Sequence, residues 1–65
     1  MKIKYFSDTD TLYIELCPAE VDETRELDEY TLLDLDSEGR LCAMTIEHAS
    51  ERMAIPDFSY EQLPA

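Results

Sequence analysis

Glycine, basic residues and long apolar runs are all scarce in this chain of 65 residues. Gly39 is the only glycine, which excludes the glycine-rich loops that cradle phosphate groups. The chain has five Lys and Arg and sixteen Asp and Glu, so its basic residues are too few to neutralise a track of nucleic-acid phosphates. No apolar run approaches membrane-spanning length, and Met1–Lys4 is unlike the start of a signal peptide. These absences predict a cytoplasmic protein that binds neither nucleic acid nor membranes.

Cysteine occurs only twice, at Cys17 and Cys42. Their separation fits neither a C-x-x-C redox pair nor a set of zinc ligands. Each lies within an apolar run, and a free cysteine behaves as a small hydrophobic residue. We therefore expect two buried, reduced thiols, with a structural disulfide as the alternative.

Acidic residues, in contrast, are abundant, and they give a formal net charge of −11 at pH 7. The composition is 45% hydrophobic, which is too apolar for a disordered acidic chain, so we expect it to fold. A chain this short buries only about 60% of its unfolded surface, so its core is marginal. We predict one β-rich domain over residues 1–53, a tail over 54–65, and a homo-oligomer, most simply a dimer, that completes the core.

Alternating polar and apolar residues predict short β-strands along most of the chain. The predicted strands are 2–6, 11–17, 20–29, 30–36 and 41–47. The third contains six acids and one base, which suits the edge of a sheet, where charges discourage unwanted pairing. Gly39 lies in a turn and is expected to take a positive φ. The predicted fold class is mainly β: a small antiparallel β-meander of four to five strands with a short C-terminal helical segment.

The alternation stops after the last predicted strand. Residues 49–53 predict one helical turn that ends before Pro56, because the residue preceding a proline avoids the helical conformation. Asp57 is a candidate N-cap for a second short helix. Phe58 and Tyr60 are too apolar to leave in water, so we expect the tail to dock on the sheet or on a partner subunit.

Candidate catalytic and metal-binding residues are few, and each has a structural interpretation. Residues 34–39 place acids at positions one, three and five before a glycine, as an EF-hand calcium loop does, but Thr45 replaces the acid at position twelve. We interpret this segment as a hairpin turn. Asp8 and Asp10 suit Asx-turns, and His48 is expected to close the last strand or cap the turn after it. The sequence assigns no catalytic residue, metal ligand or cofactor.

Non-catalytic protein binding is the leading functional prediction. An acidic surface attracts basic partners, and aromatic side chains dominate the energetics of protein interfaces. Tyr5 is assigned to the core instead. The candidate partner-binding residues are Tyr13, Glu20, Asp22, Glu23, Glu26, Phe58 and Tyr60.

Two other classes of function stay open at this stage. A purely structural subunit would assemble with itself and have no other partner. A small-ligand or metal-dependent enzyme would use carboxylates and the lone histidine. The residues available to such an enzyme are Asp8, Asp10, Asp34, Asp36 and His48.

Three stretches together form a recognisable pattern. They are Lys2-Ile3-Lys4-Tyr5 with Asp10-Thr11-Leu12-Tyr13-Ile14-Glu15-Leu16, Leu33-Asp34-Leu35-Asp36-Ser37-Glu38-Gly39-Arg40-Leu41, and Ile46-Glu47-His48-Ala49-Ser50. Over about residues 1–53 the chain resembles a family of small bacterial proteins, the domain of unknown function 2283. It departs from that family at Ala43, often glycine there, and at Thr45, often an acid. The resemblance implies a short β-rich protein with no established activity. Some members are thought to accompany small toxin-like partners, which implies an antitoxin-type role.

Overall fold

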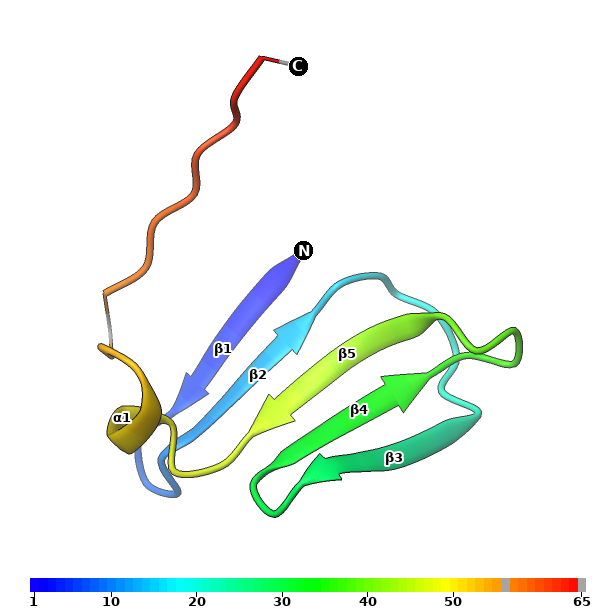
Figure 1. Cartoon of the computed structure of the whole chain (residues 1–65), viewed down its shortest axis with the longest axis horizontal. Helices are drawn as coiled ribbons and strands as arrows, with labels where there is room; N and C mark the ends of the chain where they lie inside the picture. The colour runs from blue at the N-terminus through cyan, green and yellow to red at the C-terminus, as the bar shows by residue number, and fades with distance from the viewer. Residues whose placement is uncertain (56, 65) are drawn as a thin grey trace.

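The computed structural model describes residues 1–55 and 57–64, which form one five-stranded antiparallel sheet with a short helix at one end (Figure 1). The strands are β1 (Lys2–Phe6), β2 (Thr11–Glu15), β3 (Glu23–Asp28), β4 (Thr31–Leu35) and β5 (Leu41–Ile46), and the helix is α1 (Ala49–Arg52). The predicted fold class is confirmed, and each strand lies within its predicted range. In the part of the chain that the structure describes, no helix has the length and apolar character needed to cross a membrane.

The strand order is β1-β2-β5-β4-β3, so it does not follow the sequence throughout. β1 and β2 form a hairpin, β3 to β5 form a meander, and the two units join where β2 pairs with β5. The segment after β2 therefore crosses to the far edge of the sheet before β3 begins (Figure 1). This order places the apolar β2 and β5 centrally and leaves β3, with all six residues exposed, at an edge as predicted.

The pairing register divides the side chains between two faces of the sheet. We call the face that carries α1 the helix face and the opposite one the open face. On the helix face, a first row of cross-strand neighbours consists of Tyr5, Leu12, Ile46 and Thr31. A second row on the same face consists of Ile3, Ile14, Met44 and Leu33. The open-face row consists of Lys4, Tyr13, Thr45, Leu32 and Glu26.

The core is small and lies between α1 and the first helix-face row. Leu12 and Ile46, each 8% exposed, pack with Ala49, which is 0% exposed. The surrounding apolar residues are only half-buried, among them Met44 and Met53. The Cα atoms span 35 × 32 × 18 Å, because a single sheet forms most of the molecule. Most domains bury their apolar surface between at least two layers, and in residues 1–55 and 57–64 the second layer is limited to α1 and the residues that follow it.

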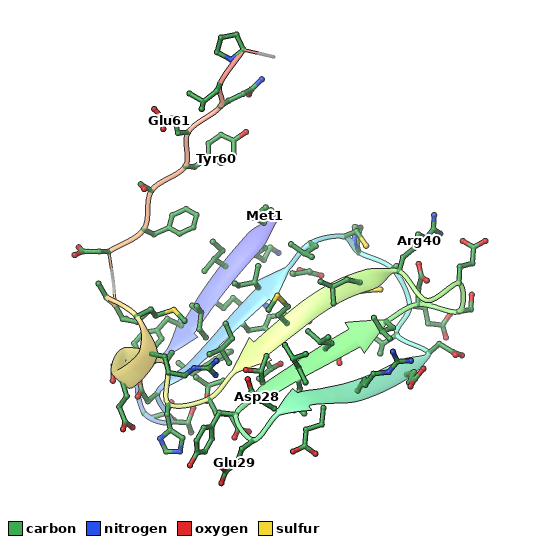
Figure 2. The ribbon with its side chains drawn as sticks, viewed as in Figure 1. Met1, Asp28, Glu29, Arg40, Tyr60 and Glu61 are labelled. Carbon is green, nitrogen blue, oxygen red and sulfur yellow. The ribbon has the colours of Figure 1, made fainter. Side chains whose placement is uncertain are left out.

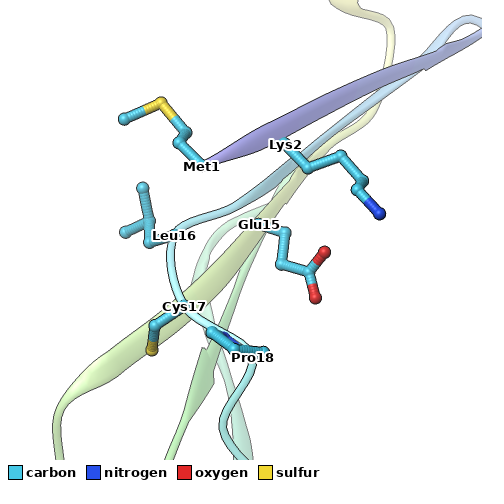
Figure 3. A pocket seen from close by; sticks show the side chains of 6 residues that line it. All are labelled: Met1, Lys2, Glu15, Leu16, Cys17 and Pro18. Carbon is cyan, nitrogen blue, oxygen red and sulfur yellow. The ribbon is translucent and has the colours of Figure 1, made fainter.

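The end of β2 adjoins both cysteines. Cys17 lies in the wall of a shallow pocket of about 160 Å³ together with Lys2 and Glu15 (Figure 3). Both cysteines are free; Cys42 is 1% exposed, and Cys17 is half-buried. Burial, above all, raises the pKa of the Cys42 thiol, which keeps it protonated at neutral pH. The prediction of burial is therefore confirmed for Cys42 alone.

The tail differs from the prediction. Residues 57–64 contain no helix, so the second predicted helix is wrong, whereas the turn of α1 is confirmed; Pro56 lies outside the described residues. The tail is instead extended and leads away from the sheet on the β1 side (Figures 1 and 2). A helix this short is unstable in water without packing partners. Phe58 and Tyr60 remain 66% and 73% exposed.

Candidate functional site

Asp10 connects the first hairpin to α1. It follows the turn after β1 with a φ of 54°, and its carbonyl accepts the Ala49 N–H at 2.9 Å. Its carboxylate accepts the Ser50 N–H through Oδ1 at 3.0 Å and the Ser50 hydroxyl through Oδ2 at 2.8 Å. The first N–H groups of a helix lack intrahelical partners, and His48, the residue before α1, makes no side-chain cap. Asp10 therefore caps α1 from 40 residues away in the sequence.

Tyr5 supplies a further hydrogen bond to the same carboxylate. Its hydroxyl donates to Asp10 Oδ1 at 2.6 Å. The ring is 37% exposed because β1 is an edge strand, so the assignment of Tyr5 to the core is wrong. Hydrogen bonds from Tyr5, and then from Ser50, lower the pKa of Asp10, and the bond to Asp10 raises the pKa of Tyr5. Asp10 thus acts as an ionised acceptor for distant groups and not as the predicted Asx-turn residue.

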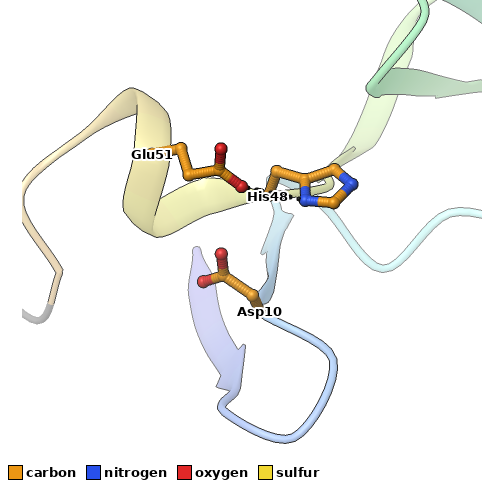
Figure 4. Close-up of side chains that lie close together, drawn as sticks. All are labelled: Asp10, His48 and Glu51. Atoms are coloured by element: carbon orange, nitrogen blue, oxygen red, sulfur yellow. Dashed lines mark hydrogen bonds and ion pairs between the residues drawn. The ribbon is translucent and has the colours of Figure 1, made fainter.

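His48 and Glu51 lie beside Asp10 (Figure 4). His48 has a left-handed conformation with φ 53° and ψ 43° between β5 and α1, so it closes the last strand as predicted. Its Nδ1 lies 3.1 Å from Glu51 Oε2, and its ring meets Tyr30 edge-on with centroids 4.7 Å apart. One ligand atom from each of Asp10, His48 and Glu51 lies within 4.8 Å of the others.

These three residues, which we call the Asp10 cluster, offer an imidazole nitrogen and carboxylate oxygens, donors that divalent transition metals accept. Much of that capacity is already used within the protein. Both Asp10 oxygens accept hydrogen bonds, and His48 Nδ1 faces Glu51. The arrangement therefore has a clear structural role, which is to hold α1 on the sheet.

Asp36 organises the β4–β5 turn at the opposite end of the sheet (Figure 1). Its Oδ1 accepts the N–H groups of Glu38 and Arg40, each at 2.9 Å, and its Oδ2 accepts Arg40 Nε at 3.0 Å. These bonds, led by the Arg40 N–H, lower the pKa of Asp36. Gly39 has the expected positive φ of 79°. The segment that imitates a calcium loop is therefore a hairpin turn, as predicted.

The structure thus separates the residues of the enzyme alternative. Asp10 and His48 adjoin each other, and Asp8 stays exposed in the turn after β1. Asp36 lies at the far end of the sheet, and Asp34 accepts the Thr24 hydroxyl at 2.8 Å there. Glu51 joins the first group without having been predicted.

The four predicted partner-binding acids gather along one edge of the sheet. Glu20 and Asp22 line a small polar pocket of about 200 Å³ just before β3. Glu23 and Glu26 follow on the exposed β3 itself. Leu27 adds an apolar side chain that is 62% exposed. We call this region, residues 20–28, the acidic edge.

The three predicted partner-binding aromatic residues do not join the acidic edge as one group. Tyr13 is half-buried in the open-face row that also contains Glu26. Phe58 and Tyr60 belong to the tail, which leaves the sheet beyond β1 and therefore at the edge opposite to β3 (Figure 1). The predicted residues are thus divided: Glu26 shares the open face with Tyr13, Glu23 shares the helix face with Arg25, and Phe58 and Tyr60 lie on the tail.

The fold and the surface define a small, acidic, antiparallel β-sheet protein with one capped helix. The chain belongs to the family described as protein of unknown function, DUF2283, whose model matches residues 2–50 and confirms the resemblance seen in the sequence. The matched range contains all five strands and extends to Ser50, so it includes both residues of the Asp10–Ser50 connection. No curated protein and no solved structure matches the chain significantly.

Proposed function

We propose that this chain is a non-catalytic protein-binding module that takes a basic partner on its open face and acidic edge. The observation that carries the proposal is the open-face row. Its middle, formed by Tyr13, Thr45 and Leu32, is uncharged and half-buried, although no helix or strand of the described residues covers it. On the β4 side this row continues to Glu26 on the acidic edge.

The uncharged middle supplies the contact area that such a partner needs. A tyrosine offers a large, rigid, apolar ring with a polar end, and such residues are enriched among the strongest interface contacts. Ala43, in the neighbouring row, is 1% exposed and leaves the surface beside Tyr13 and Leu32 flat. An apolar part of the partner can therefore contact the ring of Tyr13 and the side chain of Leu32 without desolvating a charged group.

Acids then select the partner by charge. Glu15 and Asp34 flank Ala43 in its row, and Glu26 on the acidic edge ends the neighbouring open-face row. With a net charge of −11, the chain accelerates encounter with a basic protein and repels acidic ones. One concrete form of this function is an antitoxin that neutralises a small basic toxin, as the family resemblance implies.

Charge reversal on the acidic edge is expected to abolish capture of the partner. Tagged protein with Glu23→Lys and Glu26→Lys should retain no basic protein from its host at about 50 mM NaCl, whereas the wild type retains one stoichiometrically and releases it at about 500 mM. Affinity capture followed by mass spectrometry measures both the partner and its salt dependence.

The matched control changes the same charge elsewhere. The control variant carries Glu38→Lys and Glu61→Lys, so its net charge changes by the same amount. Glu38 forms an ion pair with Arg40, as Glu23 does with Arg25, so each double variant also loses one ion pair. Control protein should still capture the partner. Equal loss in both double variants, or a retained protein that is insensitive to salt, would contradict local recognition by the acidic edge.

A metal-dependent enzyme is a second candidate, and the 4.8 Å grouping of the Asp10 cluster is the observation that favours it. Titration with Zn²⁺ or Ni²⁺, followed by calorimetry, tests it directly. Stoichiometric binding that is lost in His48→Ala but kept in Asp8→Asn would support this candidate. An absence of heat at about 100 µM metal would contradict it.

A further inference from the structure

We propose that a second copy of this chain covers the helix face, in a two-fold dimer. The interface consists of the second helix-face row together with two residues of the tail: Ile3, Ile14, Met44, Leu33, Phe58 and Tyr60. The proposal concerns the face opposite to the open face and does not rest on the proposed partner binding.

The helix α1 leaves this row uncovered. Ala49 packs on the first row, and at the far end of that row Arg52 Nη1 donates to Thr31 Oγ1 at 2.8 Å. Arg52 also lies 3.6 Å from an Asp28 carboxylate oxygen on β3. The second row lies beside the first, and Met53 and Ile55, which follow the helix, adjoin Ile3 and Ile14 at the β1–β2 end of it. Among the described residues, no helix or strand covers its other end, at Met44 and Leu33.

The second row is free of charge over four strands. Its members lie on β1, β2, β5 and β4 in turn, all are apolar, and all stay half-buried. Only at the fifth strand does a charge appear, with Arg25 beside Leu33. The open-face row ends on Glu26, whereas this row ends on the basic Arg25, so it presents no acid to a basic partner and suits a second copy of the same apolar surface.

The exposed area matches what a dimer requires. The chain has an accessible surface of 5130 Å². A compact monomer of 7.5 kDa is expected to expose about 4,200 Å². The excess, about 900 Å², includes the extended tail, and it is close to the roughly 800 Å² that each partner buries in a standard protein interface. Two such single sheets packed face to face, about 10 Å apart, would form the missing second layer.

The tail places additional apolar surface at the rim of the same face. Phe58 and Tyr60 line an open hollow of about 650 Å³ with Met1 and Ile3. Phe58 also borders a more enclosed apolar hollow of about 250 Å³ next to Ile14. A partner sheet set on the second row would fill both hollows and bury two aromatic side chains that are otherwise exposed.

The test uses neighbouring leucines on opposite faces. Leu33 and Leu32 are adjacent on β4 and both half-buried, so Leu33→Glu and Leu32→Glu add the same charge to the same strand. Sedimentation equilibrium should show a wild-type dimer, a monomer for Leu33→Glu and a dimer for Leu32→Glu. Because each copy carries −11, raising NaCl from about 50 to about 500 mM should strengthen the dimer, opposite to its effect on binding of a basic partner.

A tail variant keeps the test valid if Leu33→Glu fails to fold. Phe58 and Tyr60 lie outside the sheet, so the double variant Phe58→Ser, Tyr60→Ser should keep the far-ultraviolet circular dichroism spectrum of the wild type. Its dimer dissociation constant should rise by at least about tenfold. A wild type that remains monomeric at about 100 µM in both salts would overturn the proposal. Dissociation by Leu32→Glu with a Leu33→Glu dimer intact would also overturn it, since the interface would then be the open face.

Discussion

Ile46→Ala is expected to remove about half of the protein's free energy of unfolding. Ile46 is 8% exposed and packs with Leu12 and Ala49, which are the other members of the buried cluster under α1. Truncating a buried isoleucine to alanine costs about 2–5 kcal/mol of the free energy of unfolding. A domain of 65 residues has a total of only about 3–10 kcal/mol. One truncation therefore removes much of the available stability.

Urea denaturation followed by circular dichroism measures this effect, with Thr45→Ala as the control. Thr45 is adjacent to Ile46 on β5 but belongs to the open face, and it is half-buried. Its truncation should cost less than about 1 kcal/mol. Both variants must be compared at the same protein concentration, because dimer formation adds to apparent stability. Similar midpoints for Ile46→Ala and the wild type would contradict a core located under α1.

The strands were predictable because each one is a local pattern. Alternation with a period of two marks a half-buried strand, and all five strands lie within the ranges that alternation predicts. Acidic composition also predicted correctly that β3 is an edge strand. Gly39 and the turn it occupies followed from the same local chemistry, since a short hairpin needs a positive φ.

Contacts between distant segments were not predictable in this way. The pairing of β2 with β5 depends on which apolar strands reach the centre of the sheet, and no local pattern encodes that choice. The bond from Ser50 to Asp10 crosses 40 residues, so Asp10 had the appearance of an ordinary turn residue. Glu51 joined the Asp10 cluster for the same reason, because its position depends on where Asp10 holds α1.

The predicted partner-binding set was divided for a related reason. Acids near one another in sequence stayed together, because residues 20–28 form one edge segment and the loop before it. Aromatic residues were grouped only by chemical type, and the tail emerges at the β1 side, opposite to β3. We therefore assign the exposed Phe58 and Tyr60 to the proposed dimer interface, and the acidic edge to the proposed basic partner.

Asp10→Asn is expected to lower the melting temperature at pH 7 by about 4–8 °C in a domain of this size, because the hydrogen bonds from Tyr5 and Ser50 lose a charged acceptor. Asparagine keeps the shape of the side chain and tolerates the left-handed φ of 54° at this position, so the variant isolates the loss of charge. Asp8→Asn removes the same charge from the same turn, where the side chain is exposed, and should leave the melting temperature nearly unchanged.

The pH dependence of this difference identifies its cause. Hydrogen bonds from Tyr5 and Ser50 hold the pKa of folded Asp10 below its ordinary value of about 4. Its contribution is therefore complete above that value and is lost as the pH falls through the lower, folded pKa. Relief of acidic repulsion on acidification affects wild type and variant alike, so it cancels in their difference. Melting curves at successively lower pH should bring wild type and Asp10→Asn progressively closer below about pH 4, because a protonated Asp10 resembles the asparagine. A gap that stays constant over this range would mean that shape, and not charge, connects the first hairpin to α1.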